Sequence, residues 1–263
     1  MHFHLPKPLH GWREFVGEVG IIVVGVLIAL GAEQVVETVH MHRQAADANR
    51  RIRAEIGDAS ALEIERVAIG PCLTQRIGQI AEGLASGRTD WRGMLFSADR
   101  ERPTALREIY HMPSRLWVTD AYREALARGD LNSVEAGRRG TIAALYNQVD
   151  EMAEINQSEQ QLATTFAPLQ FNRPLSDPER NQMIATLARL DSMNGLMVLI
   201  SRQNFQTTHT LGYAMTRSDL FGNIATGGWE GELASMRNRY GACVDASAID
   251  QYEAIAIKGA EAE

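Results

Sequence analysis

The sequence predicts an all-α protein, with an N-terminal transmembrane helix followed by a helical-bundle domain that contains a long antiparallel helical hairpin. The first observation behind this prediction is a single apolar segment, residues 15–36, ahead of a much longer polar chain. The second is that the prolines leave three long stretches free, 9–70, 114–167 and 179–263, all rich in helix-forming residues. No stretch alternates apolar and polar residues with a period of two, so a sheet is not expected.

The apolar segment has the length and flanks of a membrane anchor. Its uninterrupted core, Val19–Ala32, gives about 21 Å of helix, which is short for a hydrocarbon layer of about 30 Å. Extending the helix to Phe15–Val36 gives about 33 Å and places Glu18 and Glu33 near the two interfaces. A cleaved signal peptide is the alternative. Glu18 ahead of the core, and a helical pattern that continues beyond it, favour an uncleaved anchor.

Flanking charges predict the orientation. Lys7, Arg13 and Glu14 precede the segment, whereas the charges of the fifteen residues that follow it cancel. The positive-inside rule therefore predicts a single-pass protein of a bacterial inner membrane with its N-terminus in the cytoplasm. The expected parts are a cytoplasmic tail (1–14), a transmembrane helix (15–36) and a periplasmic α-helical domain (37–263).

The two cysteines, Cys72 and Cys243, are expected on the same side of the membrane. In an exported domain they can form a disulfide that closes a very long loop. Two buried reduced thiols are the alternative, and the predicted export favours the disulfide.

Composition and motifs exclude several classes of function. The net charge is −7, and Lys7 and Lys258 are the only lysines, so we expect no nucleic-acid partner. The chain lacks the serine-hydrolase, zinc-protease, dinucleotide and P-loop motifs. We therefore expect no catalytic residue, no cofactor and no metal. Glu33, Glu37 and His40 share one helical face, and we interpret them as a solvated surface next to the membrane.

Proline and glycine positions define the first helices of the domain. We expect the membrane helix to continue to about Ile69 and to end at Gly70–Pro71, followed by a second helix over Cys72–Ser86. Residues 88–115 are mixed and are expected to form loop and short helices. Thr119 is predicted to cap a helix that stops at Gly129.

Two long helices are predicted next. The first begins at Asn132, with Glu135 as its capping-box partner, and runs to about Phe166. The second begins at Ser176, where a cap, an early proline and Glu179 coincide, and runs to about residue 211. Each carries a stripe at helical spacing, so the pair should form an antiparallel hairpin: Ile142, Leu145, Val149, Met152, Asn156 and Glu159; then Met183, Leu187, Leu190, Asn194, Met197, Ser201 and Asn204. Residues 212–228 are expected to be loop, before a last helix over Glu230–Tyr240.

The anchor carries the one resemblance to known proteins. Gly17-Glu18 precedes an Ile/Val-rich segment that ends in Leu27-Ile28-Ala29-Leu30. This pattern resembles the opening of a family of uncharacterised single-pass proteins from proteobacteria, over roughly the first 35 residues. The resemblance implies a membrane anchor and brings no activity with it.

Small residues on the anchor predict helix packing within the membrane. Gly25, Ala29 and Glu33 are four apart on one face, and Gly17 and Gly20 add small residues lower on the helix, although Gly and Ala are also common in membrane helices in general. The Glu18 carboxylate, close to hydrocarbon, either binds a partner or extends to the interface. We therefore predict a structural or accessory protein whose partners are the lipid bilayer and either copies of itself or a larger membrane complex. The alternative is an exported ligand-sensing module that signals through a partner, with a pocket lined by Trp91, Tyr110, Trp117 and Tyr122.

Overall fold

The computed structural model describes residues 12–87, 89–93, 110–222 and 226–260, and within them the predicted all-α fold is confirmed. The predicted tail up to residue 11, and most of the predicted loop at 88–115, lie outside the described residues. The helices are α1 (Trp12–Ala85), α2 (Asp120–Arg128), α3 (Ala136–Ala163), the 3-10 helix η1 (Thr164–Gln170), α4 (Asp177–Thr210), α5 (Arg217–Phe221), α6 (Gly228–Tyr240) and α7 (Ala248–Ala260). Two short strands, β1 (Asp90–Trp91) and β2 (Arg173–Pro174), pair antiparallel.

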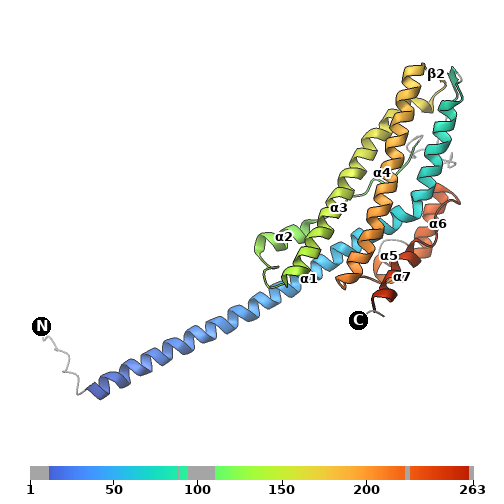
Figure 1. The fold of residues 1–263 in the computed structure, drawn as a ribbon. Coiled ribbons are helices and arrows are strands. Elements are labelled where there is room, and N and C mark those ends of the chain that lie inside the picture. Colours follow the sequence, from blue (N-terminus) through green and yellow to red (C-terminus); the bar gives the residue numbers. More distant parts are fainter. Residues whose placement is uncertain (1–11, 88, 94–109, 223–225, 261–263) are drawn as a thin grey trace.

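Helix α1 forms both the part that projects from the bundle and the helix around which the bundle packs. Its N-terminal part projects from the bundle as a single rod, and its C-terminal part runs inside the bundle beside α4 (Figure 1). Helices α3 and α4 form the predicted antiparallel hairpin, and α7 packs on α1 and α4. The stripes predicted for α3 and α4 are buried along their whole length, as predicted. The hairpin therefore covers one side of α1.

The predicted break at Gly70–Pro71 is wrong, because α1 continues through Pro71 to Ala85. Figure 1 shows that the helix changes direction in its cyan-to-teal part instead of ending there. Proline lacks the N–H that would bond the carbonyl four residues earlier, and this loosens the turn. Other segments bond to carbonyls of this turn: Asn194 Nδ2 donates to Gly70 O at 3.0 Å, and Asp245 N donates to Ala68 O at 2.8 Å. Tertiary contacts therefore keep the helix continuous.

The predicted cysteine pair lies beside this bend. Cys72 and Cys243 are at disulfide distance, with an S–S separation of 2.06 Å and a Cα–Cα distance of 5.1 Å. Cys243 belongs to the connection between α6 and α7, so the bridge holds the C-terminal helices against α1 one residue beyond Pro71.

Of the three predicted caps, Ser176 is confirmed, Thr119 is right in position only, and Asn132 is wrong. Helix α3 begins at Ala136 and not at Asn132, because the carboxylate of Glu135 itself accepts hydrogen bonds from the backbone N–H groups of the first turn. Thr119 is the N-cap residue of α2, and the helix stops at Gly129, both as predicted, but the Thr119 side chain makes no capping hydrogen bond. Ser176 caps α4 by accepting from the backbone N–H of Glu179, as predicted.

The C-terminal region contains more helix than the sequence indicated. The predicted loop at 212–228 includes α5, which has its own capping box between Thr216 and Asp219. The last predicted helix begins at Gly228, where Gly227 and Gly228 both have positive φ. Helix α7 was not predicted, and it buries Ile249 and Tyr252 completely or nearly so.

The disulfide is expected to contribute strongly to the stability of the domain. Replacing both Cys72 and Cys243 by Ala should lower the free energy of unfolding by about 3–5 kcal/mol, because the bridge closes a loop that spans most of the domain. Thermal unfolding of the full-length chain in detergent measures the change. Reductant should lower the melting temperature of the wild type to that of the double variant and leave the variant unchanged. A wild type that melts at the same temperature after full reduction, verified by alkylation and mass measurement, would contradict this expectation.

Candidate functional site

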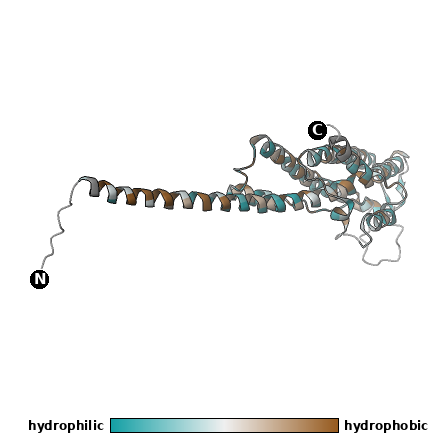
Figure 2. Cartoon of the chain, turned by 90° about the horizontal axis from the view of Figure 1, so that it is seen from below, coloured by the Kyte–Doolittle hydropathy of each residue, from teal (hydrophilic) through white to brown (hydrophobic). Residues whose placement is uncertain are grey.

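The N-terminal part of α1 exposes apolar side chains on every side. Ile21, Ile22, Val26 and Leu27 are each more than half exposed, and at helical spacing they point in different directions around the helix. The first buried residue of α1 is Ala48. Figure 2 shows the hydrophobic colouring along the extended part and its change to hydrophilic colouring towards the bundle. By length and composition, this segment is able to cross a membrane. Helix α4 passes the same test, but Met197 and Ile200 of its apolar stretch are buried in the bundle, while Leu196 and Leu199 are exposed.

None of the residues predicted to pack in the membrane contacts another element among the described residues. A Cβ placed on Gly17 or Gly25 would meet no atom within 4 Å. Glu18, Ala29 and Glu33 are all exposed. This part of α1 therefore has no intramolecular partner in the described structure.

Between the apolar segment and the bundle lies an exposed stretch of helix, residues 37–47, which we call the stalk. It places Ala48 about 18 Å beyond Val36 along the helix axis. Its polar side chains bond locally: His42 Nδ1 lies 2.7 Å from Thr38 O, and Gln44 Nε2 lies 2.9 Å from His40 Nε2. Across the described chain, no three His, Cys, Asp or Glu side chains gather as metal ligands would. The stalk is thus a solvated helix that holds the bundle away from the apolar segment.

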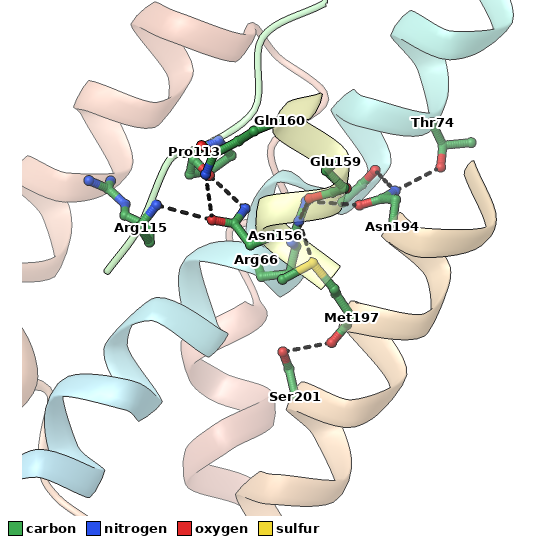
Figure 3. Close-up of polar contacts among 11 residues, drawn as sticks. Arg66, Thr74, Pro113, Arg115, Asn156, Glu159, Gln160, Asn194, Met197 and Ser201 are labelled. Atoms are coloured by element: carbon green, nitrogen blue, oxygen red, sulfur yellow. Dashed lines mark hydrogen bonds and ion pairs between the residues drawn. The ribbon is translucent and has the colours of Figure 1, made fainter. Parts of the chain in front are cut away.

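A layer of buried polar side chains crosses the bundle where α1, α3 and α4 meet (Figure 3). Arg66 of α1 and Glu159 of α3 form an ion pair with almost no solvent exposure. The Arg66 guanidinium also approaches Asn194 Oδ1 at 3.5 Å and Met197 Sδ at 2.6 Å, both on α4. Burial raises the pKa of Glu159, and the Arg66 charge opposes this rise. We call Arg66, Glu159 and Asn194 the polar layer.

The segment before α2 is held to the polar layer by Asn156. Its side-chain Nδ2 donates to Pro113 O at 2.9 Å, and its Oδ1 accepts from the backbone N of Arg115 at 3.2 Å. The Arg115 guanidinium binds the carboxylate of Glu65 through two nitrogens, and this hydrogen bond raises the pKa of Arg115. A small cavity beside these residues is also lined by Trp117 and Leu62. Its size suits a water-sized occupant and no metabolite.

Glu55 anchors α2 to α1. Its carboxylate accepts the backbone N–H groups of Ala121 at 2.8 Å and Tyr122 at 3.2 Å, and the hydroxyl of Tyr146 at 2.7 Å. A carboxylate at a helix N-terminus also interacts favourably with the helix dipole. This contact replaces the capping predicted for Thr119, and it spans too many residues for a local sequence pattern to indicate it.

Glu63 is the most strongly perturbed carboxyl group of α1. It is completely enclosed between helices, and burial raises its pKa to about 8 although Asn204 Nδ2 donates to it at 2.5 Å. Tyr252 of α7 lies near enough for the Glu63 charge to raise its pKa. At neutral pH, Glu63 is therefore mostly protonated and acts as a neutral hydrogen-bonding group between α1 and α4.

The four aromatic residues predicted to line a sensing pocket do not come together. Trp91 and Tyr110 belong to the main core, where Trp91 Nε1 donates to Leu169 O at 2.7 Å. Trp117 packs on a separate cluster of α3 and α4 residues, and Tyr122 stacks on Tyr146 at 4.1 Å between ring centroids. They serve three different packing clusters, which removes the structural basis for an aromatic pocket.

No family model, curated protein or solved structure matches the chain. The resemblance of the anchor to proteobacterial single-pass proteins therefore stays a prediction. The exposed anchor, the stalk and the buried polar layer are the features on which a functional proposal can rest.

Breaking the buried ion pair on one side should be strongly destabilising. Arg66→Met leaves the Glu159 carboxylate buried without its cation, so we expect the free energy of unfolding to fall by about 3–5 kcal/mol. The double variant Arg66→Met/Glu159→Leu should regain most of this loss, because no charge is then buried unpaired. Urea unfolding followed by circular dichroism provides both values. A double variant as unstable as the single one would show that packing, and not the unpaired charge, causes the loss.

The buried Glu63 should make stability depend on pH. Its pKa is higher in the folded state, about 8, than the ordinary value of 4.5. Stability is therefore fully present below about pH 4.5 and falls as pH rises towards 8, since only the unfolded state releases the proton. Glu63→Gln should flatten this fall by a few kcal/mol over the window, measured by urea unfolding at several pH values.

One further titrating group and one control variant need to be considered to isolate the contribution of Glu63 to the pH dependence of stability. Burial lowers the pKa of His209, and its contribution to the pH dependence is the same in wild type and variant. Glu82→Gln, an exposed position on the same helix, should leave the pH dependence unchanged. If Glu63→Gln and wild type lose stability in parallel between pH 5 and 8, Glu63 is not the group responsible.

Proposed function

We propose that this protein is a membrane-anchored accessory protein. The apolar part of α1 inserts into a lipid bilayer, the stalk spaces the bundle from the membrane surface, and the bundle associates with copies of the same chain or with a larger membrane complex. In this proposal the domain is not an enzyme.

The observation that carries the proposal is the continuity of α1. One helix joins a segment that is apolar and exposed on all sides to the polar layer of the bundle. A helix that is apolar all round needs an apolar environment on every side, and a bilayer supplies it. A soluble partner bound to one face would leave the remaining apolar side chains in water. The resemblance of the anchor to proteobacterial single-pass proteins points in the same direction.

Charge and cysteine chemistry support an exported bundle. The cations before the anchor favour a cytoplasmic N-terminus by the positive-inside rule. A paired Cys72 and Cys243 fits an oxidising compartment such as the periplasm. The proposed location is therefore a bacterial inner membrane with the bundle on the periplasmic side.

The buried ionisable groups of the bundle support a structural role. Glu55, Glu65, Arg66 and Glu159 each bond to side chains or backbone groups of another segment. They hold helices together and do not converge on an open cleft. The aromatic pocket expected for a sensing role is not formed, because its four residues lie in separate clusters.

Purification of the full-length chain from membranes tests the proposal. Extracted in a mild detergent, it should elute as an assembly larger than one chain in a detergent micelle, either as an oligomer or with a copurifying membrane protein. Protease added to spheroplasts before extraction should digest the bundle, because the proposed orientation exposes it to the medium.

Two results would count against the proposal. A full-length chain that is released without detergent would not be anchored. A monomer that elutes alone at every mild detergent tested, with no membrane protein bound, would remove the accessory role. Protection of the bundle in spheroplasts that becomes digestion after lysis would reverse the orientation while leaving the anchor in place.

A further inference from the structure

An uncharged, exposed face of α1 runs from the end of the apolar segment into the stalk. Val35, Val39, His42 and Ala46 follow it at spacings of four, three and four residues, whereas the exposed Met41 lies on the opposite side. In water, exposed valines on a lone helix are unfavourable, and a second helix would remove them from solvent. This face therefore points to a helical partner.

The same face continues without a break into the apolar segment. Positions spaced alternately four and three residues apart, the repeat of a left-handed coiled coil, run through both parts of the helix. We call this set the seam: Ile21, Gly25, Ile28, Ala32, Val35, Val39, His42 and Ala46. Small residues at Gly25 and Ala32 allow close approach of a neighbouring helix within lipid. The seam extends over about 39 Å, which is long enough for several layers of helix packing.

The seam is uncovered, and it ends where the chain covers its own face. All its members are exposed, and none carries a carboxylate, an ammonium or a guanidinium group. Three residues after Ala46, Asn49 accepts a hydrogen bond from the Tyr213 hydroxyl at 2.5 Å. One turn further, Arg53 Nη2 donates to Ala214 O at 3.5 Å. From Asn49 onwards this face of α1 is occupied by the segment that leads into α5.

Charge placement fits a second copy of the same chain. Glu33, Glu37 and Asp47 lie on other faces of the helix, so two identical seams meet without opposing like charges. At the flanks, Thr38 of one helix would lie near Arg43 of the other. Because both copies insert with the same orientation, their seams are necessarily parallel and can align residue by residue. The part of the seam outside the membrane is short, so pairing needs the anchor to hold the copies together.

We propose that the seam of α1 pairs with the seam of a second copy in a parallel helix pair that runs through the membrane and along the stalk. This inference rests on the proposed membrane anchoring and names the partner that the accessory role leaves open. The bundles then stand side by side beyond Ala48, where each α1 begins to pack against its own chain.

Disulfide cross-linking of the full-length protein in native membranes tests the pairing. Since Cys72 and Cys243 bond to each other, each introduced cysteine is a new free thiol. Val35→Cys and Val39→Cys lie on the seam; Glu37→Cys and Met41→Cys lie at matched depth on the opposite side of the helix. Under mild oxidation, the two seam variants should form a covalent dimer at least several-fold more than their matched controls.

Three outcomes would contradict the proposed pairing of two seams. They are equal cross-linking at all four positions, no dimer at any of them, or a cross-linked product with the mass of a different protein. The result is separable from the accessory role. If the mild-detergent extract still contains a larger complex while the seam variants fail to cross-link, the inference fails and the accessory role stands. If the extract contains only monomer, both fail.

Discussion

Pro71 removes a hydrogen-bond donor from within a helix of 74 residues, and two distant parts of the chain, α4 and the connection between α6 and α7, meet the helix around that turn. Asn194 of α4 bonds to Gly70 O, Asp245 bonds to Ala68 O, and Cys243 bonds covalently to Cys72. A bent helix with partnered carbonyls can follow α4 on both sides of the bend, whereas a broken helix would need a loop with its own polar groups to satisfy. The position of α4, α6 and α7 on the bundle thus depends on this one turn.

The polar layer next to the bend restricts how the helices can slide. Buried charges cost desolvation energy, and an apolar core of the same volume would be at least as stable. The buried charges instead fix the register of the helices. Moving α3 by one turn along α1 would separate Arg66 from Glu159 and leave two charges buried without partners. Asn156 and Glu55 apply the same constraint to the 110–119 segment and to α2. One register of the helices is favoured, because other registers would leave buried polar groups without hydrogen-bond partners.

Helix α1 also connects the membrane-facing part of the chain directly to this layer. No proline interrupts it between Trp12 and Gly70, and the stalk adds no loop. A tilt or rotation of the apolar segment is therefore carried by the helix itself to the contacts of Glu55, Glu63 and Arg66. In the proposed paired arrangement, the two bundles would be held relative to each other by the same continuous helix.

Local sequence determined the helical class, the apolar segment, the buried faces of α3 and α4, and the cap at Ser176, because each depends on residues within one or two helical turns. It also identified Cys72 and Cys243 as candidates for pairing, although their approach to 5.1 Å between Cα atoms is a property of the folded bundle. Tertiary structure alone decided the features whose partners are far apart in the chain. Pro71 reads locally as a helix end and becomes a bend only because Asn194 and Asp245 bond to the carbonyls beside it. Thr119 occupies the predicted N-cap position, but the N–H groups at the start of α2 bond to the carboxylate of Glu55 from α1 instead of to its side chain. The raised pKa of Glu63 likewise exists only once α1 and α4 enclose it.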